Sequence, residues 1–200
     1  MTTEDKPECQ KVMKLVADYM NTPLLFVDCQ ETDVLRWNGM TFHLNSPLYQ
    51  AKNLSLALET LNVLGIWLEE NEIQEVIDHF QWAGRFMVLR KAPLVLLDGA
   101  HNVHGITALI HALKNFHGKI YFSVLKEKDA PHMIELLQTI SKDITLVEIS
   151  SARLYPLEKL GYPIITVDEL ISRLLDTKED SLLCGSLYYV GEVLEKWGNV

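Results

Sequence analysis

Apolar positions in the carboxy-terminal part of the chain alternate between short continuous runs and helical spacings. Runs typical of buried strands cover residues 85–89, 94–97, 119–125, 144–149, 164–167 and 182–184. Spacings typical of helices cover residues 102–116, 131–140, 169–175 and 187–197. Strands that alternate with helices of about ten residues indicate right-handed crossovers and a mainly parallel sheet covered on both faces. We therefore expect an α/β, Rossmann-like domain with a mostly parallel sheet from this part of the chain.

The preceding part of the chain shows no such alternation. Its pattern predicts helices at residues 11–20, 49–64 and 71–80, and short strands at residues 24–29, 34–37 and 40–44. Asn38 and Gly39 stand between the last two strands, and this dipeptide is typical of a β-hairpin turn. The pattern changes near residues 81–84, which predicts a domain boundary between residues 1–82 and residues 83–200.

Charge and composition narrow the classes of partner. The chain has 200 residues and a formal net charge of −9, which argues against a nucleic acid or an anionic membrane as partner. No apolar run approaches the roughly 20 residues of a membrane span, and from the polar start we expect no signal peptide. Cys9, Cys29 and Cys184 lie far apart without a Cys-x-x-Cys spacing, so we expect reduced thiols and a cytoplasmic protein.

The most informative stretch is residues 98–102, Asp-Gly-Ala-His-Asn, which follows the apolar run at residues 94–97. In an open α/β sheet the point where such a strand gives way to a helix lies at the carboxyl edge, where ligands bind. The Asp98 carboxylate can accept two hydroxyl hydrogen bonds, as from a ribose, and the His101 ring can donate, accept or titrate near neutral pH. The same stretch also fits a strand end with Asn102 as a helix cap.

The string Asp-Gly-Ala-His-Asn after an apolar strand resembles the signature of the carboxy-terminal domain of folylpolyglutamate and dihydrofolate synthases, which are members of the Mur ligase superfamily. Three further segments are similar to this family: residues 49–53 (Tyr-Gln-Ala-Lys-Asn), residues 82–86 (Trp-Ala-Gly-Arg-Phe) and residues 184–193 (Cys-Gly-Ser-Leu-Tyr-Tyr-Val-Gly-Glu-Val). The chain departs from the family at Ala83 and Val103, where proline is usual, and we expect these changes to alter turn rigidity more than chemistry.

The resemblance implies an ATP-dependent ligase that joins L-glutamate to a folate or to dihydropteroate through an acyl phosphate. It implies three cofactor-binding residues, with Asn53 at adenine, Asp98 at the ribose and Arg85 at the phosphates. It also implies that His101 and Ser186 are catalytic residues that orient glutamate or the acyl phosphate. These residue types suit such roles, because an amide can pair with a purine edge and a guanidinium with a phosphate. No cation is assigned to the carboxylates of glutamate.

One element of such an enzyme is absent from the sequence. No Gly-x-x-x-x-Gly-Lys-Ser/Thr loop is present to cradle the phosphates of ATP. The resemblance therefore implies the carboxy-terminal part of a longer enzyme, in which residues 1–82 are the tail of a central α/β ATPase domain and residues 83–200 the glutamate-ligase domain. The ligands of the Mg²⁺ in Mg-ATP would then lie in the missing amino-terminal part. We expect no metal ligands here and no synthase activity from the isolated chain.

Two other classes of function are weighed against this interpretation. A non-catalytic regulatory or binding α/β domain would fit the same fold. A metal hydrolase would use Asp98, His101 and His104, with His111 two turns further along, because imidazoles suit Zn²⁺. Against the hydrolase, Asp98 should precede the helix and no His-Glu-x-x-His frame is present. Other Mur ligases are less favoured, because Gly-Ala between Asp98 and His101 fits the folate branch better.

Overall fold

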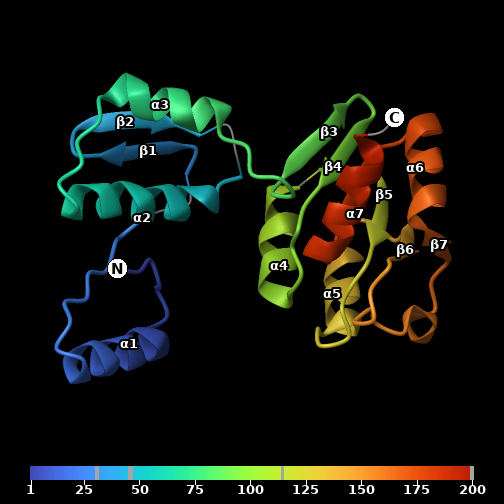
Figure 1. Cartoon of the computed structure of the whole chain (residues 1–200), viewed down its shortest axis with the longest axis horizontal. Helices are drawn as coiled ribbons and strands as arrows, with labels where there is room; N and C mark the ends of the chain where they lie inside the picture. Colours follow the sequence, from blue (N-terminus) through green and yellow to red (C-terminus); the bar gives the residue numbers. More distant parts are fainter. Residues whose placement is uncertain (30–31, 45–46, 114, 199–200) are drawn as a thin grey trace. The chain divides into compact units, whose positions relative to one another are not determined.

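The structure, a computed structural model, describes residues 1–29, 32–44, 47–113 and 115–198. The chain divides into two compact units, Met1–Phe80 and Gln81–Val200 (Figure 1). Each unit has a buried hydrophobic core of its own.

The unit Met1–Phe80 combines helices with one β-hairpin. Its elements are α1 (Pro7–Tyr19), β1 (Val34–Trp37), β2 (Met40–His43), α2 (Gln50–Val63) and α3 (Glu70–His79). β1 and β2 pair antiparallel across Asn38 and Gly39, whose φ angles of 47° and 83° are those of a tight hairpin turn. The predicted helices and hairpin of this unit are therefore confirmed. Its core contains Leu35, Phe42, Leu44, Ala51, Leu58 and Ile73.

The strand predicted at residues 24–29 is wrong. This segment forms only an isolated bridge, in which Thr2 N donates to Leu25 O at 3.0 Å and Val27 N donates to Thr2 O at 2.9 Å. Thr2 Oγ1 also accepts a hydrogen bond from Glu4 N at 3.0 Å, so the chain turns away after one paired residue. A β-ladder needs a partner strand that runs alongside for several residues.

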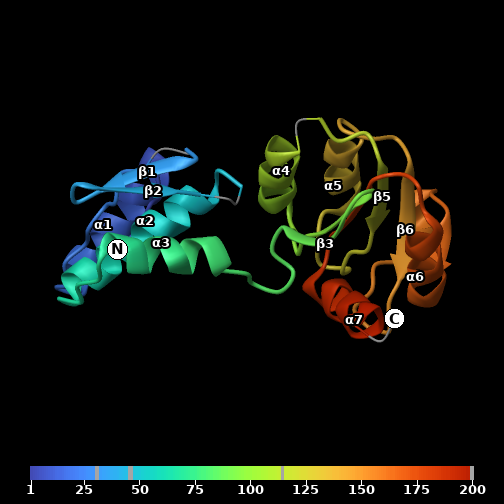
Figure 2. The ribbon, with the colours of Figure 1, turned by 90° about the horizontal axis from the view of Figure 1, so that it is seen from above.

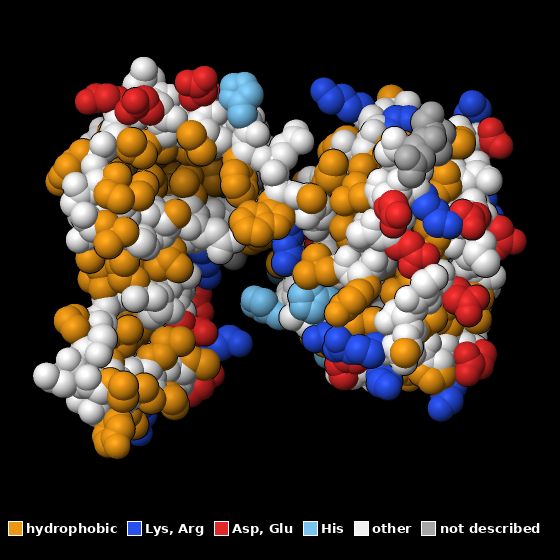
Figure 3. Space-filling model, viewed as in Figure 1, with side chains coloured by type: hydrophobic (Ala, Val, Ile, Leu, Met, Phe, Trp, Pro, Cys, Tyr) orange, Lys and Arg blue, Asp and Glu red, His pale blue; other side chains and the backbone are white. Residues whose placement is uncertain are grey.

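Helix α1 exposes its apolar face. None of its residues is buried, and the exposed fractions of Val12, Leu15, Val16 and Tyr19 are 60%, 61%, 56% and 89%. Figure 3 shows further hydrophobic side chains gathered over the surface of this unit. A helix of this length gains little stability by itself in water, and a contiguous exposed apolar face marks an interaction surface.

The unit Gln81–Val200 is built on a six-stranded sheet with the order β3-β4-β8-β5-β6-β7. The strands are β3 (Met87–Lys91), β4 (Leu94–Leu97), β5 (Lys119–Phe122), β6 (Ile144–Glu148), β7 (Ile164–Thr166) and β8 (Ser181–Cys184). All neighbouring pairs are parallel except β3 and β4. The predicted α/β fold with a mostly parallel sheet is confirmed. β3 begins two residues later than predicted, because Phe86 has a φ of 45° that no strand residue adopts.

Helices cover both faces of this sheet, as Figure 2 shows. α4 (Val103–Ala112) and α5 (Ala130–Leu137) pack on one face, and α6 (Val167–Asp176) and α7 (Leu187–Trp197) pack on the other. A short 3-10 helix at Leu157–Leu160 was not predicted. α4 ends earlier than predicted, because Leu113 leaves the helical conformation at φ −110° and ψ 41°.

The parallel strands place five chain segments along one edge. β4, β8, β5, β6 and β7 all end there, and adjacent strands lie about 4.8 Å apart. The turn after β4 carries Asp98 and His101, and the turn after β8 carries Gly185 and Ser186. The sheet topology therefore brings three of the expected site residues to the same edge.

Gly185 is the residue at this edge that tolerates a side chain least. Its φ is 115°, and an added Cβ would lie 2.3 Å from the carbonyl oxygen of Ser123. Gly161 offers a matched control, since it also has a positive φ, 74°, but an added Cβ there would meet nothing within 4 Å.

We predict that Gly185→Ala lowers the free energy of unfolding much more than Gly161→Ala does. The control substitution should cost about 1–2 kcal/mol, the usual penalty of a side chain in the left-handed region. Gly185→Ala adds to this penalty a clash with backbone that cannot move aside. Urea unfolding of both variants measures the difference, and equal losses would contradict the tight β8–α7 turn.

Candidate active site

A buried carboxylate joins the segment before β3 to the turn after β4. Asp98 is 3% exposed, and its two oxygens accept hydrogen bonds from Phe86 N and Ala100 N, each at 2.7 Å. Beside it, Gly99 N donates to Gly84 O, also at 2.7 Å. These three bonds fix the position of the Gly84–Phe86 segment, and they hold Phe86 in its unfavourable positive-φ conformation.

Burial sets the electrostatics of this carboxylate. Desolvation raises the pKa of Asp98 above its ordinary value, although the two backbone N–H donors and the nearby positive charges of Arg85 and His101 oppose the rise. Each oxygen keeps a second lone pair beyond the one that its backbone donor uses. These remaining lone pairs are what Asp98 can offer to a hydroxyl group of a ligand.

The turn after β4 packs directly against the start of α7. A Cβ added to Gly99 would lie 2.3 Å from Leu187 Cδ2, and one added to Gly84 would lie 2.4 Å from Val190 Cγ1. Leu187 is the first residue of α7 and directly follows Ser186. The two turns that carry Asp98 and Ser186 are therefore in contact.

His101 is half-buried, and its ring has a defined hydrogen-bond direction. Its Nδ1 lies 2.8 Å from Gly99 O. A carbonyl oxygen can only accept, so Nδ1 carries the hydrogen and Nε2 keeps its lone pair in the neutral ring. The residue therefore offers an acceptor at the sheet edge.

Of the helices that begin at this edge, α4 and α7 follow the two turns that carry the expected residues, and each has a polar cap. Asn102 Oδ1 accepts from Gly105 N at 2.7 Å at the start of α4, which is the capping role that its position suggested. Ser186 Oγ accepts from Tyr188 N at 3.2 Å at the start of α7, and Ser186 is 1% exposed. The hydroxyl hydrogen of Ser186 remains available to donate. Both helix dipoles favour negative charge at this edge.

Beyond β8, the loops after β5 and β6 pair with each other at this edge. Leu125 and Leu154 form an isolated antiparallel bridge, and Lys126 N donates to Arg153 O at 2.8 Å. The Arg153 guanidinium forms an ion pair with Glu127. Nothing in the sequence pattern marks Arg153 as a site residue, because its place at the edge depends on this pairing of two loops.

The remaining expected residues are exposed. Arg85 is exposed next to Asp98, and it forms no ion pair within the part of the chain that the structure describes. Asn53 belongs to the unit Met1–Phe80, where it lies on the first turn of α2 and donates from Nδ2 to Gln50 Oε1 at 2.7 Å. The ligand-binding roles of Asn53, Arg85, Asp98, His101 and Ser186 stay predictions.

The described residues contain no group of three or more His, Cys, Asp or Glu side chains that could hold a metal ion. His104 and His111 are exposed on α4, while Asp98 is engaged by backbone donors. A metal hydrolase therefore has no ligand set among these residues. Of the helices described, none is both long enough and apolar enough to cross a membrane.

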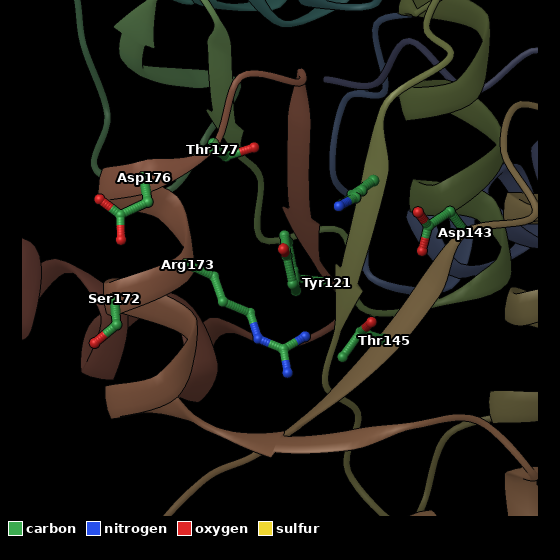
Figure 4. Close-up of a pocket in the computed structure, with 8 residues that line it drawn as sticks. Tyr121, Asp143, Thr145, Ser172, Arg173, Asp176 and Thr177 are labelled. Atoms are coloured by element: carbon green, nitrogen blue, oxygen red, sulfur yellow. The ribbon is translucent and has the colours of Figure 1, made fainter.

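A polar groove of about 400 Å³ lies at the opposite edge of the sheet. It is lined by Lys119, Tyr121, Asp143, Thr145, Ser172, Arg173, Asp176 and Thr177. Figure 4 shows Arg173 reaching from α6 toward Tyr121 and Thr145. Lys119 begins β5 and Asp143 directly precedes β6, so the groove lies at the amino-terminal ends of these strands. Ligands of open parallel sheets bind at the carboxyl ends, which places this groove apart from the candidate site.

Comparisons with known proteins agree with the sequence resemblance. No family model matches the chain. The dihydrofolate synthase/folylpolyglutamate synthase of Bacillus subtilis is 26% identical over 171 residues, which are 74% of this chain and 39% of that enzyme. The chain thus spans well under half of this curated relative.

Solved structures show the same relationship at the level of the fold. A crystal structure of Mycobacterium tuberculosis folylpolyglutamate synthase complexed with ADP and AMPPCP superposes with a TM-score of 0.81 at 20% identity, over 98% of this chain and 54% of that chain. A bifunctional folylpolyglutamate synthase/dihydrofolate synthase with Mn, AMPPNP and L-glutamate bound gives a TM-score of 0.78 at 20% identity, over 94% and 51%. The chain is similar to part of these enzymes and shares their fold.

We predict that Asp98→Asn lowers the stability of the unit Gln81–Val200 by about 1–3 kcal/mol, because the amide NH₂ leaves one backbone N–H without an acceptor. The loss should depend on pH. A raised pKa in the folded state means that the contribution of Asp98 is fully present below its unfolded pKa and is lost as the pH rises through the folded pKa. The wild-type advantage should therefore grow as the pH falls from neutral. Urea unfolding of both proteins across this range tests the sign, and an advantage that shrinks at low pH would contradict it.

Proposed function

We propose that this homologue of folylpolyglutamate and dihydrofolate synthases is the carboxy-terminal part of an ATP-dependent folate:L-glutamate ligase. The observation that carries the proposal is the carboxyl edge of the sheet, where the turns bearing Asp98, His101 and Ser186 pack against each other. The similarity to synthases of this class over most of the chain supports it.

The proposed reaction has two steps. A carboxylate of a folate or of dihydropteroate first takes the γ-phosphoryl group of ATP, which releases ADP and forms an acyl phosphate. The α-amine of L-glutamate then attacks the carbonyl carbon, the bond to the phosphate oxygen breaks, and the amine loses a proton as the amide forms. Both steps depend on positioning and on stabilisation of negative charge.

Three residues of the chain suit the nucleotide. Asp98 would accept hydroxyl groups of the ribose through the lone pairs that its backbone donors leave unused. Arg85 is exposed beside Asp98, and its planar guanidinium would reach the phosphates. Asn53 is exposed on α2, and its amide would pair with the adenine edge.

Two residues suit the acyl phosphate and the amino acid. The Nε2 lone pair of His101 would accept a hydrogen bond from the amine of glutamate and so orient it for attack. The Ser186 hydroxyl would donate to a phosphate or carboxylate oxygen at the start of α7. Closing this edge against the rest of the enzyme would exclude water from an intermediate that water destroys.

The nucleotide would be Mg-ATP, and the Mg²⁺ would not be held by this part of the enzyme. The described residues present no cluster of carboxylates or imidazoles suited to a divalent cation. We therefore assign the metal ligands, together with the phosphate-cradling loop, to the part of the relatives that this chain does not span.

The two units would have different places in the whole enzyme. Residues 1–82 would be the tail of the central ATP-binding domain, and residues 83–200 the glutamate-ligase domain. The exposed apolar face of α1 supports this division, because the remainder of an ATP-binding domain would cover it. We propose a cytoplasmic location, since the three cysteines are free thiols.

One observation favours a second function, that of a binding or regulatory α/β domain without catalysis. The polar atoms of Asp98 and Ser186 already bond to the chain's own backbone, and both residues are buried. Atoms with such structural roles are also what a non-catalytic descendant would retain. This alternative predicts ligand binding without turnover in any assembly.

We predict that the isolated chain releases no ADP in a glutamate-dependent manner, because no phosphate loop is present. Release should appear when the chain is combined with the amino-terminal half of a related synthase that carries this loop. A coupled ADP assay with and without glutamate measures both. Activity of the isolated chain would overturn the fragment interpretation, and a folded but inactive combination would favour the binding domain.

A second prediction separates the parts of the nucleotide site in such a complete enzyme. Asp98→Asn should weaken the use of ATP about 10- to 100-fold per folded molecule, because an acceptor of a charge-assisted hydrogen bond is lost. Arg85→Lys keeps the charge but loses the planar fork, so it should lower turnover more than adenosine affinity. Steady-state kinetics with ATP, normalised by a melting curve, test both. Unchanged constants in both variants would exclude this edge as the nucleotide site.

A further inference from the structure

The strand order sets how far along the edge each part of the reaction can lie. From the turn after β4, which carries Asp98, the edge runs past β8 and β5 to β6. Three strand spacings amount to about 14 Å. If the nucleotide lies at Asp98 and the attacking amine at His101, where the turn after β4 meets the turn that bears Ser186, the rest of the glutamate molecule extends toward the loops after β5 and β6. Its side-chain carboxylate needs a cation there.

Arg153 lies at that place, on a loop that is held from two sides. Its carbonyl oxygen accepts from Lys126 N at 2.8 Å, and Tyr155 N donates to Val124 O at 2.9 Å, so the loop after β6 is tied to the loop after β5. Arg153 N also donates to Ser151 Oγ at 3.2 Å. The backbone that carries Arg153 is therefore fixed relative to the sheet edge.

The side chain of Arg153 is also oriented. Its guanidinium carbon lies 5.8 Å from the centre of the Tyr188 ring, and Tyr188 N donates to the hydroxyl of Ser186. On its other side, one terminal nitrogen pairs with the Glu127 carboxylate. The cation is thus held next to the helix start that bears Ser186.

This arrangement leaves room for a second carboxylate. A guanidinium has five N–H donors, and the ion pair with Glu127 engages one of its terminal nitrogens. The Arg153 side chain is 52% exposed, so a ligand can reach the remaining donors. Arginine suits this task better than a lysine on the same loops, because its planar fork matches both oxygens of a carboxylate.

We propose that Arg153 binds the side-chain carboxylate of the L-glutamate substrate. The inference rests on the proposed function and adds the residue that makes the site specific for an acidic amino acid. Glu127 holds the guanidinium in the orientation in which a carboxylate binds, and glutamate occupies the donors that Glu127 leaves. Glutamine, which lacks the side-chain charge, gains little from Arg153.

The test is a titration of the 200-residue chain with L-glutamate, followed by NMR shifts of backbone amides around residues 101, 186 and 188. Arg153→Gln is expected to weaken glutamate binding about 10- to 100-fold, the effect of losing a charge-assisted bidentate contact. Arg173→Gln is the matched control, because it removes the same charge from the same unit at the opposite sheet edge. The control should bind glutamate as the wild type does.

A structural role of the ion pair is separated by Glu127→Gln. If Arg153 only holds the loop through Glu127, both substitutions weaken binding alike. If Arg153 binds the ligand, Glu127→Gln keeps or tightens the affinity, because it removes a competing negative charge. Arg153→Lys should fall between Arg153→Gln and the wild type. Melting curves of all variants establish that each is folded.

Titration with L-glutamine completes the design. In the wild type glutamate should bind more tightly than glutamine, and in Arg153→Gln this preference should vanish. Shifts near residues 101 and 186 that titrate with the wild-type affinity in Arg153→Gln would overturn the role of Arg153 and leave the proposed function intact. Absence of any glutamate-dependent shift in the wild type would count against both.

Discussion

The fold at the carboxyl edge of the sheet depends on one buried carboxylate. Asp98 bonds to Phe86 N before the sheet and to Ala100 N after β4, and both bonds measure 2.7 Å. This bridge holds the linker residue Arg85 next to the strand end, and it stabilises the positive φ of Phe86. The free energy of two such hydrogen bonds is comparable with the backbone strain at one positive-φ residue, about 1–3 kcal/mol. Without them the Gly84–Phe86 segment would lose its fixed position beside the turn after β4.

The sequence was sufficient for the fold of the second unit. The strands of this unit, such as residues 94–97, are buried by helices on both faces of the sheet, so they are continuously apolar. The covering helices, such as α7, carry one apolar stripe each. These two patterns alone predict the architecture. In the first unit the apolar pattern failed at residues 24–29, where the segment has only Thr2 as a pairing partner. Strand formation depends on a neighbour that a single sequence does not reveal.

The candidate site divides in the same way. Asp98, His101 and Ser186 stand at strand ends, so the motif and the parallel topology together bring them to one edge. Arg153 could not be found this way, because its place depends on the bridge between Leu125 and Leu154, a pairing of two irregular loops. The hydrogen bonds of Asp98 could not be predicted from the sequence either. An aspartate can accept hydrogen bonds from a ribose or from backbone N–H groups, and the residue type does not tell which of the two it does.

A chain with a net charge of −9 that is proposed to bind ATP and glutamate must concentrate positive potential locally. The carboxyl edge offers helix starts and two arginines for this purpose. The starts of α4 and α7 point N–H groups to it, Arg85 stands beside the turn after β4, and Arg153, on the loop after β6, reaches the start of α7. The two arginines are placed by different means. The backbone bridge of Asp98 fixes only the backbone that carries Arg85, whereas Glu127 and Tyr188 also orient the guanidinium of Arg153. Because the two anions of the proposed reaction would meet separate cations, the nucleotide and the amino acid would be selected independently.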